Sequence, residues 1–276
     1  MNLLFLCHRL PCPPSSGARI RPFHILRHWA RTHRVTVATL RHDDDEDEEA
    51  LARLAHRVLL ARVRPSVGVA RAVARVVAGG APSLGFFWSP QLARSLRELV
   101  AREPFDFVFA HSAAMGAYVA DLDVPKLIDF GDMDSEKWRV YGEHRRLPGA
   151  AAYRLEGTRL RREEARLAAA FEAATCTTRA EHADLLAIAA PRHSDWFTNG
   201  VDTERYHPAR EAPESDRVCF LGRMDYYPNV DAMVRFCRDT WPQVRRQRPR
   251  SRLSIIGADP VRAIRALGRD PSIEVT

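Results

Sequence analysis

The sequence alternates between short apolar segments and longer segments of helical periodicity, and this alternation restricts the possible folds most strongly. Residues 2–7 are an apolar run, residues 34–40 alternate and are β-branched, and residues 105–110 are apolar almost throughout. Strands that are apolar on both faces are typical of a parallel sheet covered by helices on each side. Strands that alternate with helices are joined by right-handed crossovers, which also produce a parallel sheet. The pattern therefore predicts an α/β fold.

The individual elements of the first part of the chain follow from this alternation. Strands are expected at residues 2–7, 34–40, 105–110, 126–129, 174–177 and 194–198. Helices are expected at residues 18–33, 48–61, 67–77, 90–102 and 151–173, with a turn at residues 79–82.

A change of composition divides the chain. Residues 207–216 are polar and contain two prolines, which predicts a linker between a first domain, 1–206, and a second unit, 217–276. The expected elements of the second unit are strands at 218–222, 252–257 and 273–276 and helices at 229–244 and 260–268. This unit is about 60 residues long, whereas a doubly wound domain needs roughly 100–150 residues. We therefore expect a complete first domain and an incomplete second one.

Composition limits the class of protein. The chain is 46% hydrophobic and 28% charged, which is ordinary for a folded globular protein. No stretch approaches the roughly 20 apolar residues that span a bilayer, and the N-terminus is a poor signal peptide, so a cytoplasmic location is expected. The five cysteines lack zinc-ligand spacing, and disulfides are not expected in that compartment.

The net charge of +7 is compatible with nucleic acid, phosphate-bearing substrates or an anionic membrane surface. Of the 42 basic residues, only Lys126 and Lys137 are lysines. Basic residues are also mixed with acids, as in residues 161–164. This mixture indicates solvated helix faces better than a nucleic-acid groove, so nucleic acid is not expected as a partner.

Several candidate residues follow predicted strands, where ligands bind in open α/β sheets. Gly17 lies where a loop meets a helix, so backbone N–H groups there can approach an anion, although a plain turn is the better explanation of one glycine taken alone. His111 follows an apolar strand and can position a sugar or be an ordinary loop residue. Arg223, directly after Gly222, can clamp a diphosphate with its planar guanidinium.

Four acids lie in residues 129–138, after another predicted strand. Metal binding or general-base chemistry is one interpretation, and a helix that starts at Asp134 or Ser135 is the other. No histidine accompanies these acids at metal spacing, so a metal is not expected.

The order of these segments is more specific than any one of them, and it resembles that of the bacterial family-4 retaining glycosyltransferases. The closest resemblance is to sugar transferases associated with exopolysaccharide and exosortase (PEP-CTERM) systems. The segments that carry it are residues 3–11 (LLFLCHRLP), 13–21 (PPSSGARIR), 21–27 (RPFHILR), 129–138 (DFGDMDSEKW), 198–202 (TNGVD), 220–231 (FLGRMDYYPNVD) and 253–258 (LSIIGA).

The resemblance implies the GT-B architecture, with two Rossmann-like domains, the first mainly for the acceptor and the second mainly for the nucleotide-sugar. It implies that His111 contacts the transferred sugar and that Arg223 neutralises the leaving group. Residues implied to contact the donor diphosphate are Gly17, Gly222, Arg223 and Asn229, and those implied to contact acceptor or sugar are Arg19, Asp129 and Asp132. The family needs no metal cofactor.

The resemblance also implies partners: a UDP- or GDP-sugar donor, and a saccharide or lipid-linked acceptor reached by peripheral contact with the inner membrane face. Two departures from the family pattern stand out. Asn229 occupies the place of a lysine, and the family's paired glutamates would lie beyond Thr276. The chain is therefore expected to be truncated. A degenerate, non-catalytic binding or partner subunit is the alternative function, and another α/β nucleotide enzyme or a basic nucleic-acid binder is less favoured.

Overall fold

The computed structural model describes residues 1–42, 47–143, 145–204, 206–208 and 215–276. The chain divides into two compact units, Met1–Val201 and Asp202–Thr276. Residues 209–214 of the expected linker lie outside the described residues. Each unit is described below by itself.

The first unit is built on a parallel seven-stranded sheet with the order β3-β2-β1-β4-β5-β6-β7. Its strands are β1 (Asn2–Cys7), β2 (Arg34–Arg41), β3 (Arg57–Arg62), β4 (Phe107–His111), β5 (Lys126–Gly131), β6 (Ala173–Cys176) and β7 (Ser194–Trp196). The chain winds outward from β1 to β3 and then returns to the other side of β1. This order is the doubly wound arrangement of Rossmann-like domains, and it confirms the predicted α/β class.

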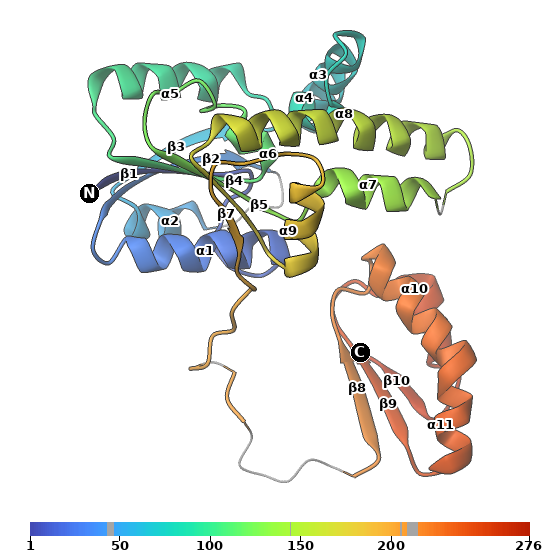
Figure 1. Ribbon diagram of the computed structural model, residues 1–276. Helices are drawn as coiled ribbons and strands as arrows, with labels where there is room; N and C mark the ends of the chain where they lie inside the picture. The colour runs from blue at the N-terminus through green and yellow to red at the C-terminus, as the bar shows by residue number, and fades with distance from the viewer. Residues whose placement is uncertain (43–46, 144, 205, 209–214) are drawn as a thin grey trace. The chain divides into compact units, whose positions relative to one another are not determined.

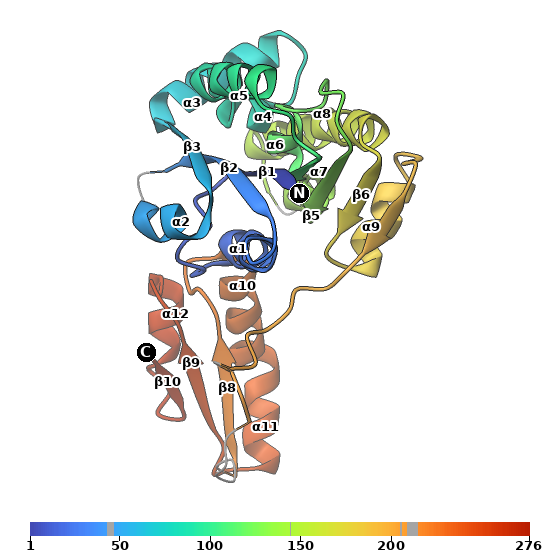
Figure 2. The same cartoon turned by 90° about the vertical axis from the view of Figure 1, so that its left-hand side faces the viewer.

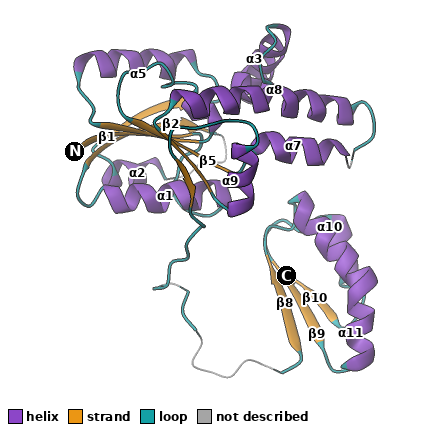
Figure 3. Cartoon of the chain, in the orientation of Figure 1, coloured by secondary structure: helices purple, strands orange, loops and turns teal. Residues whose placement is uncertain are grey.

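Helices cover both faces of this sheet (Figures 1 and 3). They are α1 (Gly17–Trp29), α2 (Glu48–Leu54), α3 (Pro65–Val77), α4 (Pro82–Phe86), α5 (Pro90–Arg102), α6 (Ala113–Gly116), α7 (Asp134–Glu143), α8 (Gly149–Ala170) and α9 (Arg179–Leu186). Leu3 and Phe5 of β1 belong to the apolar cluster that includes α1 and α2, whereas Leu4 and Leu6 belong to the cluster that includes α5 and α8. Alternate side chains of one strand therefore build two separate cores, as a pleated strand requires.

The prediction of a helix over residues 48–61 is wrong in its second half. Helix α2 ends at Leu54, Ala55 adopts an extended conformation, and β3 follows as the outermost strand beside β2. The leucines and arginines of residues 57–62 favour a helix locally, but the open edge of β2 offers a full ladder of hydrogen bonds. Tertiary pairing overrides local propensity here.

Two further outcomes concern the ends of elements. Helix α5 has the bounds expected from sequence, because Ser89 caps it through Oγ, which accepts a hydrogen bond from the backbone N–H of Leu92. Helix α7 begins at Asp134, which confirms the helix-start interpretation of that acidic segment.

The second unit contains a three-stranded parallel sheet with the order β10-β9-β8. Its elements are β8 (Arg217–Leu221), α10 (Tyr227–Arg235), a π-helical turn (Phe236–Thr240), α11 (Trp241–Gln247), β9 (Arg252–Ile256), α12 (Arg262–Leu267) and β10 (Ile273–Val275). The core of this unit includes Trp241, Ile255 and Ile264, all nearly inaccessible to solvent. In the part of the chain that the structure describes, no helix combines the length and the apolar character needed to cross a membrane.

Candidate functional site

The strand order of the first unit reverses between β1 and β4, and the carboxyl ends of these strands carry two histidines. Cys7, the last residue of β1, pairs with His111, the last residue of β4. His8 follows Cys7, and its ring stacks on the His111 ring at a centroid distance of 5.9 Å. Ligands in doubly wound sheets bind at such a reversal, outside the carboxyl ends of the strands.

A fully buried carboxylate, Asp129 of β5, links the histidine to the rest of the unit. Arg21 of α1 donates to both of its oxygens, from Nε and from Nη2, at 2.8 Å each. The Oγ1 of Thr175 donates to Oδ1 at 2.9 Å, and His111 Nδ1 lies 2.8 Å from Oδ2. The oxygens of Asp129 are thus occupied by three neighbours, and the group is out of contact with solvent.

The charge of Asp129 determines the tautomer of His111. Burial alone raises the pKa of Asp129, but the hydrogen bonds and charges of Arg21 and His111 outweigh burial and hold that pKa well below its ordinary range. An ionised carboxylate can only accept, so Nδ1 of His111 carries a proton and donates it. Nε2 is therefore the ring atom of His111 that can meet a ligand.

His8 has a different protonation behaviour. Burial is the largest cause that lowers the pKa of His8 to about 3, and the electrostatic effects of neighbouring His111 and Arg9 act in the same direction. The ring is consequently neutral near pH 7. The backbone oxygen of His8 is held 3.0 Å from Nε2 of His42.

The backbone around His111 has unusual conformations. Ser112, the next residue, has φ 79° and ψ 155°, a region that L-residues rarely adopt. Gly131, at the end of β5, has φ 71°, and a Cβ built there would lie 3.4 Å from Cε1 of His111. A side chain at Gly131 would therefore touch the His111 ring, and the positive φ favours glycine at this position.

The other predicted residues of the first unit lie in different environments. Gly17 is the exposed first residue of α1, and a Cβ placed on it would meet no atom, so open space adjoins it. Arg19, two residues after Gly17 in α1, is buried, and its Nη1 lies 3.4 Å from Ser15 Oγ. Asp132 is exposed just after β5, whereas Asp129 is buried. In this conformation Asp132 can be reached from solvent, and Asp129 contacts protein side chains instead.

In the second unit, Gly222, Arg223 and Asn229 are neighbours after β8. The side-chain amide of Asn229 donates to the backbone oxygen of Arg223 at 2.9 Å. A Cβ on Gly222 would come within 2.8 Å of the same amide nitrogen, so the glycine allows this contact. The guanidinium of Arg223 is paired with Asp225 and Asp259, at 2.7 and 3.0 Å. An anion that binds this arginine must compete with two carboxylates.

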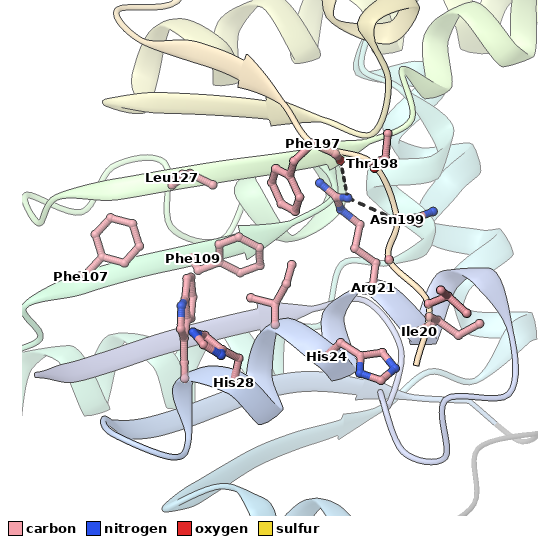
Figure 4. Close-up of a pocket in the computed structure, with 14 residues that line it drawn as sticks. Ile20, Arg21, His24, His28, Phe107, Phe109, Leu127, Phe197, Thr198 and Asn199 are labelled. Atoms are coloured by element: carbon pink, nitrogen blue, oxygen red, sulfur yellow. Dashed lines mark hydrogen bonds between the residues drawn. The ribbon is translucent and has the colours of Figure 1, made fainter. Parts of the chain in front are cut away.

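Arg21 also borders a pocket of about 510 Å³ on the face of the sheet that carries α1 (Figure 4). The pocket is lined by aromatic and aliphatic side chains of α1, β4 and β5 and by residues 197–201. The Arg21 guanidinium lies 3.8 Å from the centroid of the Phe197 ring and donates to the backbone oxygen of Phe197. The pocket is therefore bounded at one end by the same arginine that holds Asp129.

Sequence reasoning did not assign roles to Arg21, His8 or Thr175. Arg21 and Asp129 are 108 positions apart, and no local pattern marks them as partners. The one available signal was that both fall in segments of the family resemblance. Among the described residues, no cluster of three or more His, Cys, Asp or Glu side chains has the arrangement of a metal site.

The doubly wound sheet, with a histidine held by a buried carboxylate at its switch point, defines the first unit as a Rossmann-like domain. A family model described as Glycosyltransferase Family 4 matches residues 15–205, and the chain belongs to this family. No curated protein matches the sequence.

Solved structures with the same fold are only distantly similar in sequence. Sucrose-phosphate synthase from Thermosynechococcus elongatus is 13% identical, with a TM-score of 0.65, over 100% of this chain and 70% of that one. HepE from Anabaena, solved with UDP and glucose, is 15% identical, with a TM-score of 0.56, over 100% and 68%. TarM is 8% identical, with a TM-score of 0.61, over 100% and 76%. At these identities the likeness establishes the fold.

Proposed function

We propose that this protein takes part in transferring a sugar, with retention of configuration, from a UDP- or GDP-sugar to a saccharide or lipid-linked acceptor of exopolysaccharide assembly. The observation that carries the proposal is the buried Arg21–Asp129–His111 network at the switch point. The chain's membership in Glycosyltransferase Family 4 supports sugar transfer as the reaction class. HepE, which shares the fold, has been solved with UDP-glucose, and this makes UDP-glucose the first donor to test.

In the proposed mechanism, Asp129 acts through its neighbours. Its charge keeps the proton on Nδ1 of His111, so that Nε2 accepts a hydrogen bond from a hydroxyl of the transferred sugar. Arg21 balances the buried charge of Asp129 and fixes its orientation. The N–H groups at the start of α1, from Gly17 onward, would receive a phosphate oxygen. Arg19 and Asp132 remain proposed contacts for the sugar or acceptor.

In the second unit, Arg223 is the proposed group that stabilises negative charge on the departing nucleoside diphosphate. Its planar guanidinium suits phosphate oxygens. Asn229 supports the proposal by holding the backbone of Arg223, and Gly222 permits that contact. No metal is included in the proposed reaction, so EDTA is expected to leave donor affinity unchanged.

The proposal is tested by titration calorimetry of the whole chain with UDP-glucose and with GDP-mannose. His111→Ala is expected to weaken binding of the preferred donor about tenfold, because one buried hydrogen bond to the sugar is lost. His182→Ala is the matched control, since His182 of α9 contacts Ser194 Oγ of β7 and lies outside the site. Equal donor affinity in the unaltered chain and both variants would show that His111 does not contribute to donor binding.

The same samples separate the enzyme from the alternative, a non-catalytic binding or partner subunit. Release of UDP from UDP-glucose, measured with a range of saccharide acceptors, reports turnover. Donor binding without release would support the binding subunit. Absence of binding to any nucleotide-sugar would contradict both.

A further inference from the structure

Helix α3 of the first unit carries three valines on its outer surface. Val69, Val73 and Val77, here called the valine stripe, expose 55%, 59% and 85% of their surface. They are four residues apart and therefore lie on one face of the helix. Ala70 and Ala74, also exposed, continue this face. A surface helix normally directs its apolar side chains inward, so this arrangement is reversed.

The two charged residues of α3 face the protein. Arg71 donates from Nη1 to the backbone oxygen of Trp88 at 2.7 Å, and Arg75 pairs with Glu163 of α8 at 3.2 Å. Arg159 of α8 donates to the backbone oxygen of Val76. These contacts anchor one side of α3 by polar interactions and leave the valine stripe on the opposite side.

Close packing against α4 fixes the same orientation. A Cβ on Gly85 of α4 would lie 2.7 Å from the backbone oxygen of Arg71, and a Cβ on Gly68 would lie 2.8 Å from the Phe86 ring. The two helices thus meet through small residues, and α3 has no room to rotate and bury its valines. Both views place α3 at an outer edge of the first unit (Figures 1 and 2).

The chain that leads into α3 is basic. Arg62 and Arg64 directly precede the helix, and residues 50–97 contain no Asp or Glu. Arg62 and Arg64, just before α3, are exposed. The nearby carboxylate Glu163 is shared by Arg75 and Arg166. An apolar stripe within a positive field matches a surface that offers both hydrocarbon and negative charge.

We propose that the valine stripe and its surrounding arginines dock the protein on an anionic phospholipid bilayer. Helix α3, about 20 Å long, would lie in the plane of the headgroups, with the valines in the boundary between headgroups and acyl chains. Arg62 and Arg64, which precede the helix, would meet lipid phosphates while their alkyl parts remain near the apolar zone. The inference rests on the proposed function in one respect, since a lipid-linked acceptor is presented at such a surface.

Flotation of the whole chain with vesicles tests this docking. One vesicle type is phosphatidylcholine alone, and the other is an equal mixture of phosphatidylcholine and phosphatidylglycerol. Binding is expected to the mixed vesicles and to weaken as salt rises. The triple variant Val69→Gln, Val73→Gln, Val77→Gln should bind the mixed vesicles at least about tenfold more weakly, because the apolar contact is lost.

Leu186→Gln is the matched control, because Leu186 is 52% exposed on α9, away from α3. Glutamine favours helix slightly more than valine, so the triple variant keeps α3, and the urea midpoint of each variant checks the fold. The salt dependence of vesicle binding is measured on the unaltered chain, so this result does not depend on whether a variant folds. UDP-glucose titration of the same samples reports on the proposed function separately, so either proposal can fail while the other stands.

Four results would overturn the proposal. The first is no binding of the unaltered chain to mixed vesicles, and the second is equal binding by the triple variant. The third is self-association that the triple variant abolishes while vesicles remain unbound, which would assign the valine stripe to a second copy of the chain. The fourth is equal binding to vesicles of phosphatidylcholine alone, which would show that the arginines do not contribute and that the partner is not an anionic surface.

Discussion

Arg21 and Asp129 form a buried bidentate ion pair in which Nε and Nη2 of the arginine each lie 2.8 Å from a carboxylate oxygen. The side chains are 5% and 0% exposed. The pair joins α1 to the carboxyl end of β5 and holds His111 through the second lone pair of Oδ2. One ion pair therefore contributes both to the packing of the first unit and to the position of its candidate site.

Asp129→Asn is expected to lower the free energy of unfolding by about 3–5 kcal/mol, because it leaves the Arg21 charge buried without a counter-ion. Urea denaturation at neutral pH measures the loss. Glu103→Gln is the control, since Glu103 pairs with Arg57 at a partly exposed site, where an ion pair is worth under about 1 kcal/mol. Similar losses in the two variants would show that the Arg21–Asp129 pair is no more important than a surface contact.

Ser112→Gly is expected to be more stable than Ser112→Ala by about 1 kcal/mol, because glycine adopts φ 79° without the strain that alanine retains. Gly131→Ala should destabilise the protein, since φ there is 71°, a conformation that alanine adopts only with strain. Thermal unfolding of the three variants gives the comparison. Equal melting temperatures for Ser112→Gly and Ser112→Ala would mean that the backbone at this position stores no strain.

Glu164→Gln is expected to stabilise the protein above pH 7. Burial raises the pKa of Glu164 to about 7, and hydrogen bonds from Ser135 oppose this only in part. The folded-state pKa of Glu164 lies above its unfolded-state pKa. The contribution of Glu164 to the free energy of unfolding is therefore fully present below about pH 4.3 and is lost as pH rises through 7.

Glutamine keeps an acceptor for Ser135 and has no charge to bury. The gain should be on the order of 1–3 kcal/mol at pH 8 and should vanish near pH 4. Urea denaturation at the two pH values measures it. A pH-independent difference in stability between the unaltered chain and the Glu164→Gln variant would contradict the assignment of this titration to Glu164.

Arg223→Ala is expected to weaken binding of UDP about tenfold or more, since charge-assisted hydrogen bonds to the diphosphate are lost. Calorimetry with UDP measures this. Arg238→Ala is the control, because Arg238 is also exposed in the second unit and is also paired, with Asp239. If both variants bind UDP as tightly as the unaltered chain, Arg223 has no part in the donor site.

Much of the fold followed from local pattern. Apolar runs at residues 2–7 and 105–110 predicted buried parallel strands, and the helical pattern at residues 90–102 predicted α5. The pattern was wrong for residues 57–62, because the free edge of β2 stabilises a strand where the local sequence favours a helix. The candidate site was predicted in part: His111 and Asp129 were chosen for their place after strands, but their direct contact was not.

The sequence by itself determined the α/β class and the family, since hydrophobic periodicity and the order of the motifs can be read from the residues without knowledge of their contacts. Only the tertiary structure decided that Arg21 meets Asp129, that Asp129 is wholly buried, and that the valine stripe faces outward. These relationships depend on which strands are neighbours and on how α3 packs against α4. Such contacts join residues far apart in the chain, and their energies arise only when the sheet and its helices are assembled.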